Sequence, residues 1–271
     1  MNKKYFTVKN IIFAKYFNTC QILKCLLFAL CFLTNNSFAA TARNINVYSD
    51  PNLASAIIKI AREFSQKNNA TITINLDSSA DFLKNLEDES SFDVFISANS
   101  SVIDTLKQRG LIDIYNIFYV TSDKLVLVCK KDTMLPINMM QENISLIDSL
   151  KIIDDYRLNL IINHENTSEG FYGKKILSSI EFKNLKVFEK MPEDRSSLLH
   201  DIEDNPDSYG LIFASKLAKN NSLRIIASDQ ERSYQAMAIA GNNMDLAREF
   251  LKFLKTENTK KIFSDNGFIN N

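Results

Sequence analysis

The sequence predicts an α/β protein in which helices cover both faces of a mainly parallel sheet. Short apolar runs of strand length alternate with amphipathic runs of helix length from residue 45 onward. Turn and capping residues such as Asp50-Pro51-Asn52 stand between the two kinds of segment. No stretch rich in proline or glycine separates the first half of this pattern from the second, which favours two lobes joined by extended hinge segments.

The first 39 residues predict an export signal. They contain five lysines and no acidic residue, followed by an apolar core at 25–33 and then Ser37-Phe38-Ala39. Small residues at these positions indicate cleavage after Ala39 or slightly later, and an uncleaved anchor is the alternative. Without this segment, the 32 basic residues fall to 27 against 32 acidic ones. A net charge of about −5 does not suggest a nucleic-acid partner.

The first half of the chain is expected to contain three strands, each followed by a helix. The third of these helices stops at Gly110, a residue type common just after a helix end. The predicted strands are 45–48, 72–76 and 94–96, and the predicted helices are 52–67, a short one around 82–86, and one that starts near 102.

The second half repeats the pattern more loosely. A helix is entered through Gly170, and 133–149 is mixed with helix-like pieces. Cys129 lies in an apolar run and is the one cysteine outside the leader, so we expect a buried free thiol and no internal disulfide. The predicted strands are 125–129, 158–162, 187–188, 211–213, 223–227 and 236–240, and the further helices lie within 193–210 and at 244–255 and 258–264.

Small polar residues stand where predicted strands end and helices begin. Ser78 and Ser79 follow one strand, and Ser97 follows the next. The carboxyl ends of parallel strands meet helix N-termini whose free N–H groups favour anions. The same residue types are preferred helix N-caps, and on sequence chemistry alone capping is the favoured interpretation.

The sequence carries no motif for an enzyme, a metal site or a cofactor. A glycine-rich phosphate loop and a Gly-x-Ser-x-Gly motif are both absent. His164 and His200 are the only histidines, and they lack metal-ligand spacing, although His164 lies near the expected cleft. We therefore predict a non-enzymatic protein without a cofactor or metal.

The residues resemble a known family. Segments 44–66 and 74–113, the segment 205–218, and the ending 260–268 are similar to the periplasmic molybdate-binding proteins of ABC importers. The resemblance covers nearly the whole chain after the leader, and 131–157 is too loose to align. It implies the two-lobed type II periplasmic binding protein fold, with a tetrahedral oxyanion held in the cleft between the lobes by hydroxyl and backbone N–H groups.

The resemblance assigns five residues to ligand binding, with departures. Ser79 falls on a family serine that binds the anion, and Asn52 replaces a second serine. Glu169 and Arg195 fall where the family uses backbone N–H groups. Phe213 replaces a tyrosine, which removes a hydroxyl donor worth about 1.5–3 kcal/mol to a charged ligand.

These departures leave two arrangements open. Glu169 would repel a buried oxyanion and Arg195 would attract it, so the two can pair across the cleft, which favours an organic acid or a zwitterion. Alternatively, both side chains point outward and their backbone N–H groups still bind the oxyanion. Asp50, Ser78 and Ser97 are weaker candidates for the same site.

Together these observations predict a signal peptide at 1–39, a first lobe at 40–121 and 230–271, and a second lobe at 122–229. The resemblance implies a monomeric periplasmic receptor that binds molybdate or tungstate and delivers it to an ABC permease at the inner membrane. A receptor for another small anion or a zwitterion, an exported enzyme and a sensor domain remain as alternatives.

Overall fold

The computed structural model describes residues 43–87, 92–112, 117–191, 195–239 and 243–270, and the predicted signal peptide lies outside them. The strands are β1 (Arg43–Ser49), β2 (Ala70–Leu76), β3 (Val94–Ser97), β4 (Phe118–Lys130), β5 (Asn159–Asn163), β6 (Lys186–Lys190), β7 (Ser208–Phe213) and β8 (Leu223–Ala238). The α-helices are α2 (Ala54–Asn68), α3 (Ser79–Glu87), α4 (Ser100–Gln108), α5 (Leu146–Asp155), α6 (Ser168–Leu177), α7 (Arg195–Asp204), α8 (Met244–Phe253) and α9 (Glu257–Asp265). Short 3-10 helices are η1 (Pro51–Leu53), η3 (Ile137–Met139) and η5 (Ala214–Leu217).

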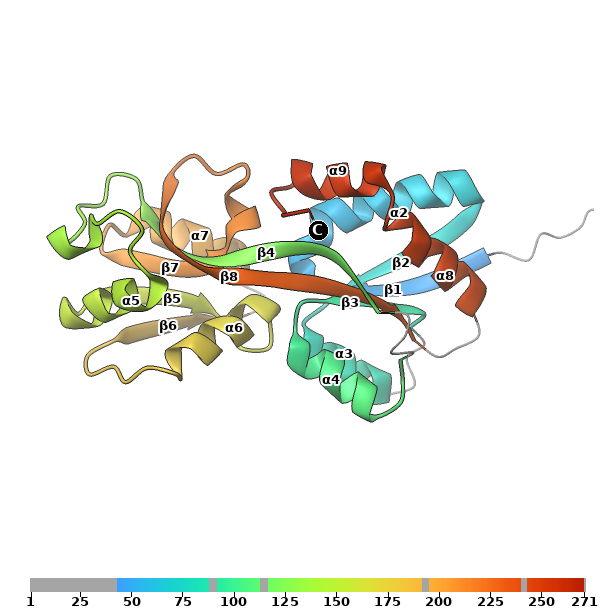
Figure 1. Ribbon diagram of the computed structural model, residues 1–271, viewed down its shortest axis with the longest axis horizontal. Helices are drawn as coiled ribbons and strands as arrows, with labels where there is room; N and C mark the ends of the chain where they lie inside the picture. Colours follow the sequence, from blue (N-terminus) through green and yellow to red (C-terminus); the bar gives the residue numbers. More distant parts are fainter. Residues whose placement is uncertain (1–42, 88–91, 113–116, 192–194, 240–242, 271) are drawn as a thin grey trace, which may run out of the picture. The chain divides into compact units, whose positions relative to one another are not determined.

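The described strands form one sheet in the order β2-β1-β3-β8-β4-β7-β5-β6. Pairing is parallel among β2, β1 and β3 and among β7, β5 and β6. The long strands β4 and β8 pair with each other and with their outer neighbours in the antiparallel direction, and they run through both halves of the sheet (Figure 1). This mixed α/β architecture confirms the predicted fold class.

Two predicted strands are parts of one element. The segments 223–227 and 236–240 were expected to be separate, but β8 continues through the polar residues between them. It remains extended there because it pairs with β4 along its length, with register shifts such as the one between Tyr119 and Thr121. Non-local pairing with β4, rather than local apolar periodicity, therefore holds the middle of β8.

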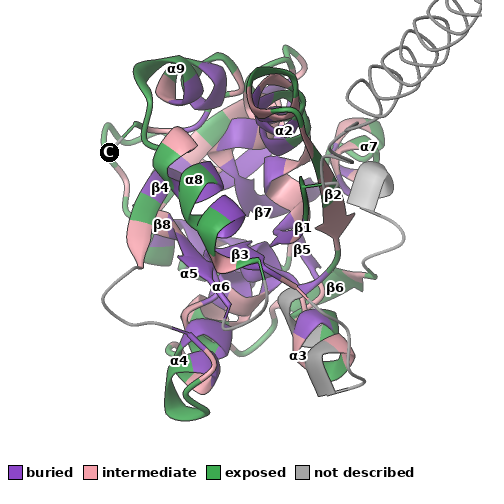
Figure 2. Ribbon diagram, turned by 90° about the vertical axis from the view of Figure 1, so that its right-hand side faces the viewer, coloured by how far each residue is buried: buried purple, intermediate pink, exposed green. Residues whose placement is uncertain are grey.

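Alternate residues of each central strand face different helices. In β1, Val47 packs in the cluster that includes α2, α8 and α9, while its neighbour Tyr48 packs with α3 and α4. In β4, Leu127 faces the first cluster, while Val126 and Val128 pack against α7. This period of two follows from the pleat of a strand, and it buries both faces of the sheet under helices (Figure 2).

Local capping fixes several helix starts near the strand ends. The hydroxyl of Ser78 accepts the Asp81 N–H at 3.2 Å at the start of α3. Thr167 caps α6 by accepting the Gly170 N–H at 3.0 Å. The stretch around 133–149 was expected to be mixed, and it contains η3 and the beginning of α5, which Ser145 caps.

One general prediction can be checked in the described part of the chain. Cys129 is buried and its thiol is free, as expected. None of the described helices is both long enough and apolar enough to span a bilayer.

Candidate functional site

A cavity of about 390 Å³ lies where the loop after β1 meets η5 and the C-terminal end of the chain. The cavity is lined by Pro51, Asn52, Ala54, Ser55, Leu199, Ser215, Lys216, Asn266 and Phe268. Its walls therefore combine the carboxyl-end loop of β1 with residues that follow β7. Such a place, at the carboxyl ends of parallel strands, is where α/β proteins commonly bind small ligands.

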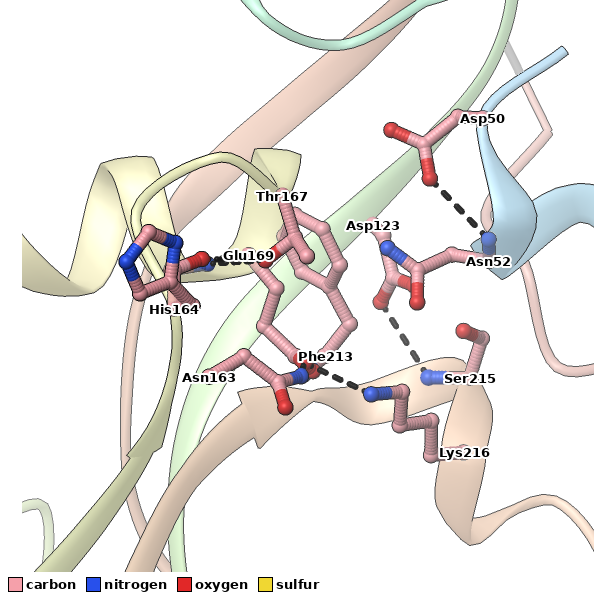
Figure 3. Close-up of polar contacts among 11 residues, drawn as sticks. Asp50, Asn52, Asp123, Asn163, His164, Thr167, Glu169, Phe213, Ser215 and Lys216 are labelled. Carbon is pink, nitrogen blue, oxygen red and sulfur yellow. Dashed lines mark hydrogen bonds and ion pairs between the residues drawn. The ribbon is translucent and has the colours of Figure 1, made fainter. Parts of the chain in front are cut away.

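Three buried carboxylates lie behind three of the wall residues. Asp50 follows β1, Asp123 lies in β4 and Glu169 lies in the first turn of α6, and their exposed fractions are 1%, 0% and 1%. The Asn52 N–H donates to Asp50 Oδ1 at 3.0 Å, and the Ser215 N–H donates to Asp123 Oδ1 at 3.2 Å. Figure 3 shows these groups around one centre.

The third carboxylate, Glu169, accepts hydrogen bonds from three residues. Lys216 Nζ donates to its Oε2 at 2.6 Å, and the Phe213 N–H donates to its Oε1 at 2.5 Å. The side-chain amide of Asn163 also donates to Oε2. The Glu169 side chain thus points inward and joins the ends of β5 and β7 to the first turn of α6 (Figure 3).

Gly170 allows this placement of Glu169. A Cβ atom on Gly170 would lie 2.1 Å from the His164 carbonyl oxygen and 2.4 Å from the Asn163 carbonyl oxygen. These atoms are backbone and cannot move aside cheaply, so only glycine lets the start of α6 approach the end of β5 so closely. Close packing therefore requires glycine directly after Glu169, and this packing sets the position of the Glu169 carboxylate.

Asp123 has the least favourable surroundings of the three. Its Oδ1 accepts the N–H groups of Ser215 and Lys124, but its Oδ2 is buried and has no hydrogen-bond partner among the described residues. The pKa of Asp123 is raised to about 6, mainly by burial and in smaller part by the charge of Glu169, while the hydrogen bonds from Ser215 and Lys124 act in the opposite direction.

The same three carboxylates also affect the pKa of the Tyr234 phenol. It is fully buried in β8. Burial raises the Tyr234 pKa well above 10.0, and the carboxylates of Asp50, Asp123 and Glu169 raise it further. Among the described residues Glu169 forms an ion pair with Lys216 and Asp123 forms none, so the buried Asp123 carboxylate leaves negative charge at the centre of the site.

Contacts across the site join α6 to the strand ends of the first half of the sheet. The Ser168 hydroxyl donates to Asp50, and it lies 3.4 Å from the Ser97 hydroxyl. The Tyr172 hydroxyl donates to the Ala98 carbonyl at 2.7 Å. The two halves of the sheet are therefore in direct polar contact at this point.

The structure brings some of the predicted residues together. Asn52 lines the cavity, Glu169 and Phe213 meet in one hydrogen bond, and Asp50 and Ser97 join through Ser168. The Ser78 hydroxyl binds Asp81 at the start of α3, which is a capping role. Ser79 and Arg195 begin α3 and α7, and their side chains lie outside the described ones.

One of the two alternatives expected for Glu169 is wrong, because its side chain does not point outward. The other, a pair with Arg195, stays a prediction, since the Arg195 side chain lies outside the described ones; among the described residues Glu169 pairs with Lys216. Sequence reasoning missed Lys216, and the reason is distance in sequence: the ion pair spans 47 positions. Asp123 was missed as well, although an acidic residue inside an otherwise buried strand is a usable signal.

His164, which was expected near the cleft, contributes mainly backbone. Its carbonyl accepts the Thr167 N–H at 3.0 Å and its Nδ1 accepts the Asn166 N–H at 3.3 Å. His200 instead pairs with Asp204 at 3.1 Å on an exposed part of α7. The described residues contain no group of three or more His, Cys, Asp or Glu side chains that could hold a metal ion.

Comparisons with known proteins agree with this fold. The family described as bacterial extracellular solute-binding protein matches residues 45–269. The molybdate-binding protein ModA of Escherichia coli is 23% identical over 250 residues, which cover 89% of this chain and 94% of the relative. A tungstate ABC transporter structure from Geobacter sulfurreducens superposes with a TM-score of 0.66 at 16% identity, covering 82% of this chain and 98% of the other. The structure of the substrate-binding domain of a putative molybdenum ABC transporter from Clostridium difficile superposes with a TM-score of 0.61 at 19% identity. The match covers 85% of this chain and 100% of the other.

Proposed function

Because the chain belongs to the bacterial extracellular solute-binding proteins, we propose that it is the periplasmic receptor of an ABC importer. In this proposal it binds a small solute between two lobes and delivers it to a permease in the inner membrane. It acts as a monomer, without nucleic acid and without turnover of its ligand. The first lobe comprises 40–121 and 230–271, the second comprises 122–229, and residues 1–39 direct export.

One observation carries the proposal. The cavity of about 390 Å³ is lined by residues of both lobes, and polar contacts such as Tyr172 to Ala98 cross between the lobes beside it. A ligand that binds such a place contacts both lobes at once and shifts an open–closed equilibrium toward the closed form. The volume is near the lower end for small-molecule sites, which suits a small solute.

A tetrahedral oxyanion is one ligand candidate, because the relatives named above bind molybdate or tungstate. Hydroxyl groups of Ser97 and Ser168 near helix N-termini support it. Another small anion or a zwitterion is the second candidate. The inward carboxylate of Glu169, which already accepts the Phe213 N–H, favours the zwitterion of these two, because it attracts a cationic group and repels an anion.

Ligand-dependent unfolding tests the proposal. The purified protein should be melted with molybdate, tungstate, sulfate, phosphate and a panel of small organic acids, amino acids and amines. A ligand at about 100 times its Kd adds about 2.7 kcal/mol to the free energy of unfolding, which gives a clear Tm increase. Small-angle scattering should show a smaller radius of gyration with the same ligand. If no solute changes either quantity, the receptor function is refuted.

A matched pair of serines on α6 checks the location. Ser168→Ala removes the hydroxyl that contacts Asp50, and we expect it to weaken both closure and ligand binding. Ser178→Ala, at the other end of the same helix, removes only an exposed contact to the Lys175 carbonyl, and binding should be unchanged. Equal effects of the two substitutions would contradict a site at the start of α6.

A further inference from the structure

The donors on the cavity wall are already bound to the protein's own carboxylates. The backbone N–H of Asn52 and that of Ser215, and the ammonium of Lys216, each donate to one of the three buried acids. An oxyanion entering the cavity would find these donors in use and would meet the Asp123 carboxylate, which has an unpaired oxygen, behind one of them. Like charges at such short range in a dehydrated site repel strongly.

Glu169 itself takes the place of a bound anion. Its carboxylate receives the Phe213 N–H, the Asn163 amide and the Lys216 ammonium. A backbone N–H, a side-chain amide and an ammonium are typical donors for a small anionic ligand. The chain therefore supplies the anion for these donors from its own sequence.

The unpartnered groups at the centre of the site are acceptors. Asp123 Oδ2 and Asn163 Oδ1 are buried, and neither has a hydrogen-bond partner among the described residues. Buried polar atoms are nearly always paired in native proteins, so two unpaired acceptors beside this negative charge indicate a missing donor. A metal ion is a poor candidate, since the described acids do not form a metal-binding group. N–H groups of an organic cation match the charge and supply the missing hydrogen bonds.

We propose that the solute carries an ammonium or guanidinium group, and that the carboxylates of Asp50, Asp123 and Glu169 bind this group in the cleft. This inference rests on the proposed receptor function, because the buried acids become accessible together only when the lobes separate. When the lobes close, the hydrogen bond from Ser168 to Asp50 forms again and the cation is enclosed. The remainder of the solute occupies the adjoining cavity, whose volume of about 390 Å³ admits a small molecule.

Calorimetric titration of the purified protein tests the charge preference. Putrescine, agmatine, lysine and ornithine form the cationic arm, and molybdate, tungstate, sulfate and phosphate form the anionic arm. The neutral diol 1,4-butanediol serves as the control for putrescine, because it has the same chain and no charge. We expect saturable binding of at least one cationic probe and none of the oxyanions or the diol.

Isosteric variants test the assigned residues. Asp123→Asn and Glu169→Gln keep the size of the side chain and remove its charge, and each should weaken the cationic probe about 10-fold to 100-fold. Glu169→Gln should also strengthen the binding of oxyanions relative to the wild type. Asp154→Asn is the matched control, since this buried carboxylate on α5 binds the Lys183 and Asn184 N–H groups instead. The affinity of the Asp154→Asn variant for the cationic probe should equal that of the wild type.

The outcomes separate this inference from the receptor function. Binding of oxyanions but not cations by the wild-type protein overturns the inference and leaves the receptor function standing. Binding of an uncharged solute, or equal binding of putrescine and 1,4-butanediol, has the same consequence. Absence of binding and closure with every probe, including the broader panel, refutes both. The wild-type comparison decides the charge preference even if a variant fails to fold.

Discussion

Replacing Asp123 by Asn should stabilise the protein at neutral pH. Burial raises the Asp123 pKa from 3.8 to about 6, and this difference corresponds to about 3 kcal/mol. The folded protein therefore holds the proton more tightly than the unfolded chain, so the free energy of unfolding falls as pH rises from about 4 to about 6. Above that window the full cost of the buried charge is present. Asn does not ionise, and its side-chain oxygen still accepts the Ser215 and Lys124 N–H groups.

Urea unfolding of wild type and Asp123→Asn at about pH 4.5 and about pH 7.5 measures this effect. We expect the variant to gain up to about 3 kcal/mol over wild type at the higher pH, or about 5–10 °C in Tm, and little at the lower pH. Asp154→Asn is the control of opposite sign. Burial raises the Asp154 pKa, but hydrogen bonds from the N–H groups of Lys183, Asn184 and Leu185 together lower it below its usual value. The Asp154→Asn variant should therefore lose stability at neutral pH. A pH-independent difference between Asp123→Asn and wild type, or a loss of stability at about pH 7.5, would refute the reasoning.

Three further predictions concern the frame of the site. Gly170→Ala should prevent the close approach of α6 to β5 and lower the free energy of unfolding in urea by about 3 kcal/mol. Gly173→Ala, whose added Cβ would lie 3.5 Å from its nearest neighbour, should be tolerated. Lys216→Met leaves Glu169 buried without its ion partner and should lower the free energy of unfolding by about 3–5 kcal/mol; an unchanged urea midpoint would contradict the pairing. Tyr172→Phe removes one contact between the lobes, and we expect about 1 kcal/mol less stability of the closed form, seen as a larger radius of gyration in scattering without ligand.

The proposed cation site explains why a costly residue such as Asp123 is present. A buried acid with an unpaired oxygen lowers stability, and a chain selected for stability alone would carry an amide or an apolar residue there. Binding sites commonly retain such groups, because the ligand supplies the missing partner. The Asp123→Asn variant should therefore gain stability and lose affinity, a combination that a purely structural role for Asp123 does not predict.

The sequence by itself determined the alternation of strands and helices, and with it the α/β class. Apolar period and capping chemistry are local, so elements such as α2 and β3 were predicted close to their observed positions. The resemblance carried by the sequence also selected Asn52, Glu169 and Phe213, which the structure brings to one region. Each of these lies directly beside a strand end or a helix start, where local pattern is informative.

The tertiary structure alone decided the continuity of β8 and the electrostatic character of the site. The middle of β8 is polar and is held by pairing with β4, a partner about a hundred residues away in sequence. Likewise, the pairing of Glu169 with Lys216 and the approach of Ser215 to Asp123 join segments 47 and 92 positions apart. Local periodicity carries no information about such pairs. Whether a carboxylate is paired, buried or left with a free oxygen depends on which distant segments fold around it, and in this protein that arrangement determines the charge that the cleft presents to its ligand.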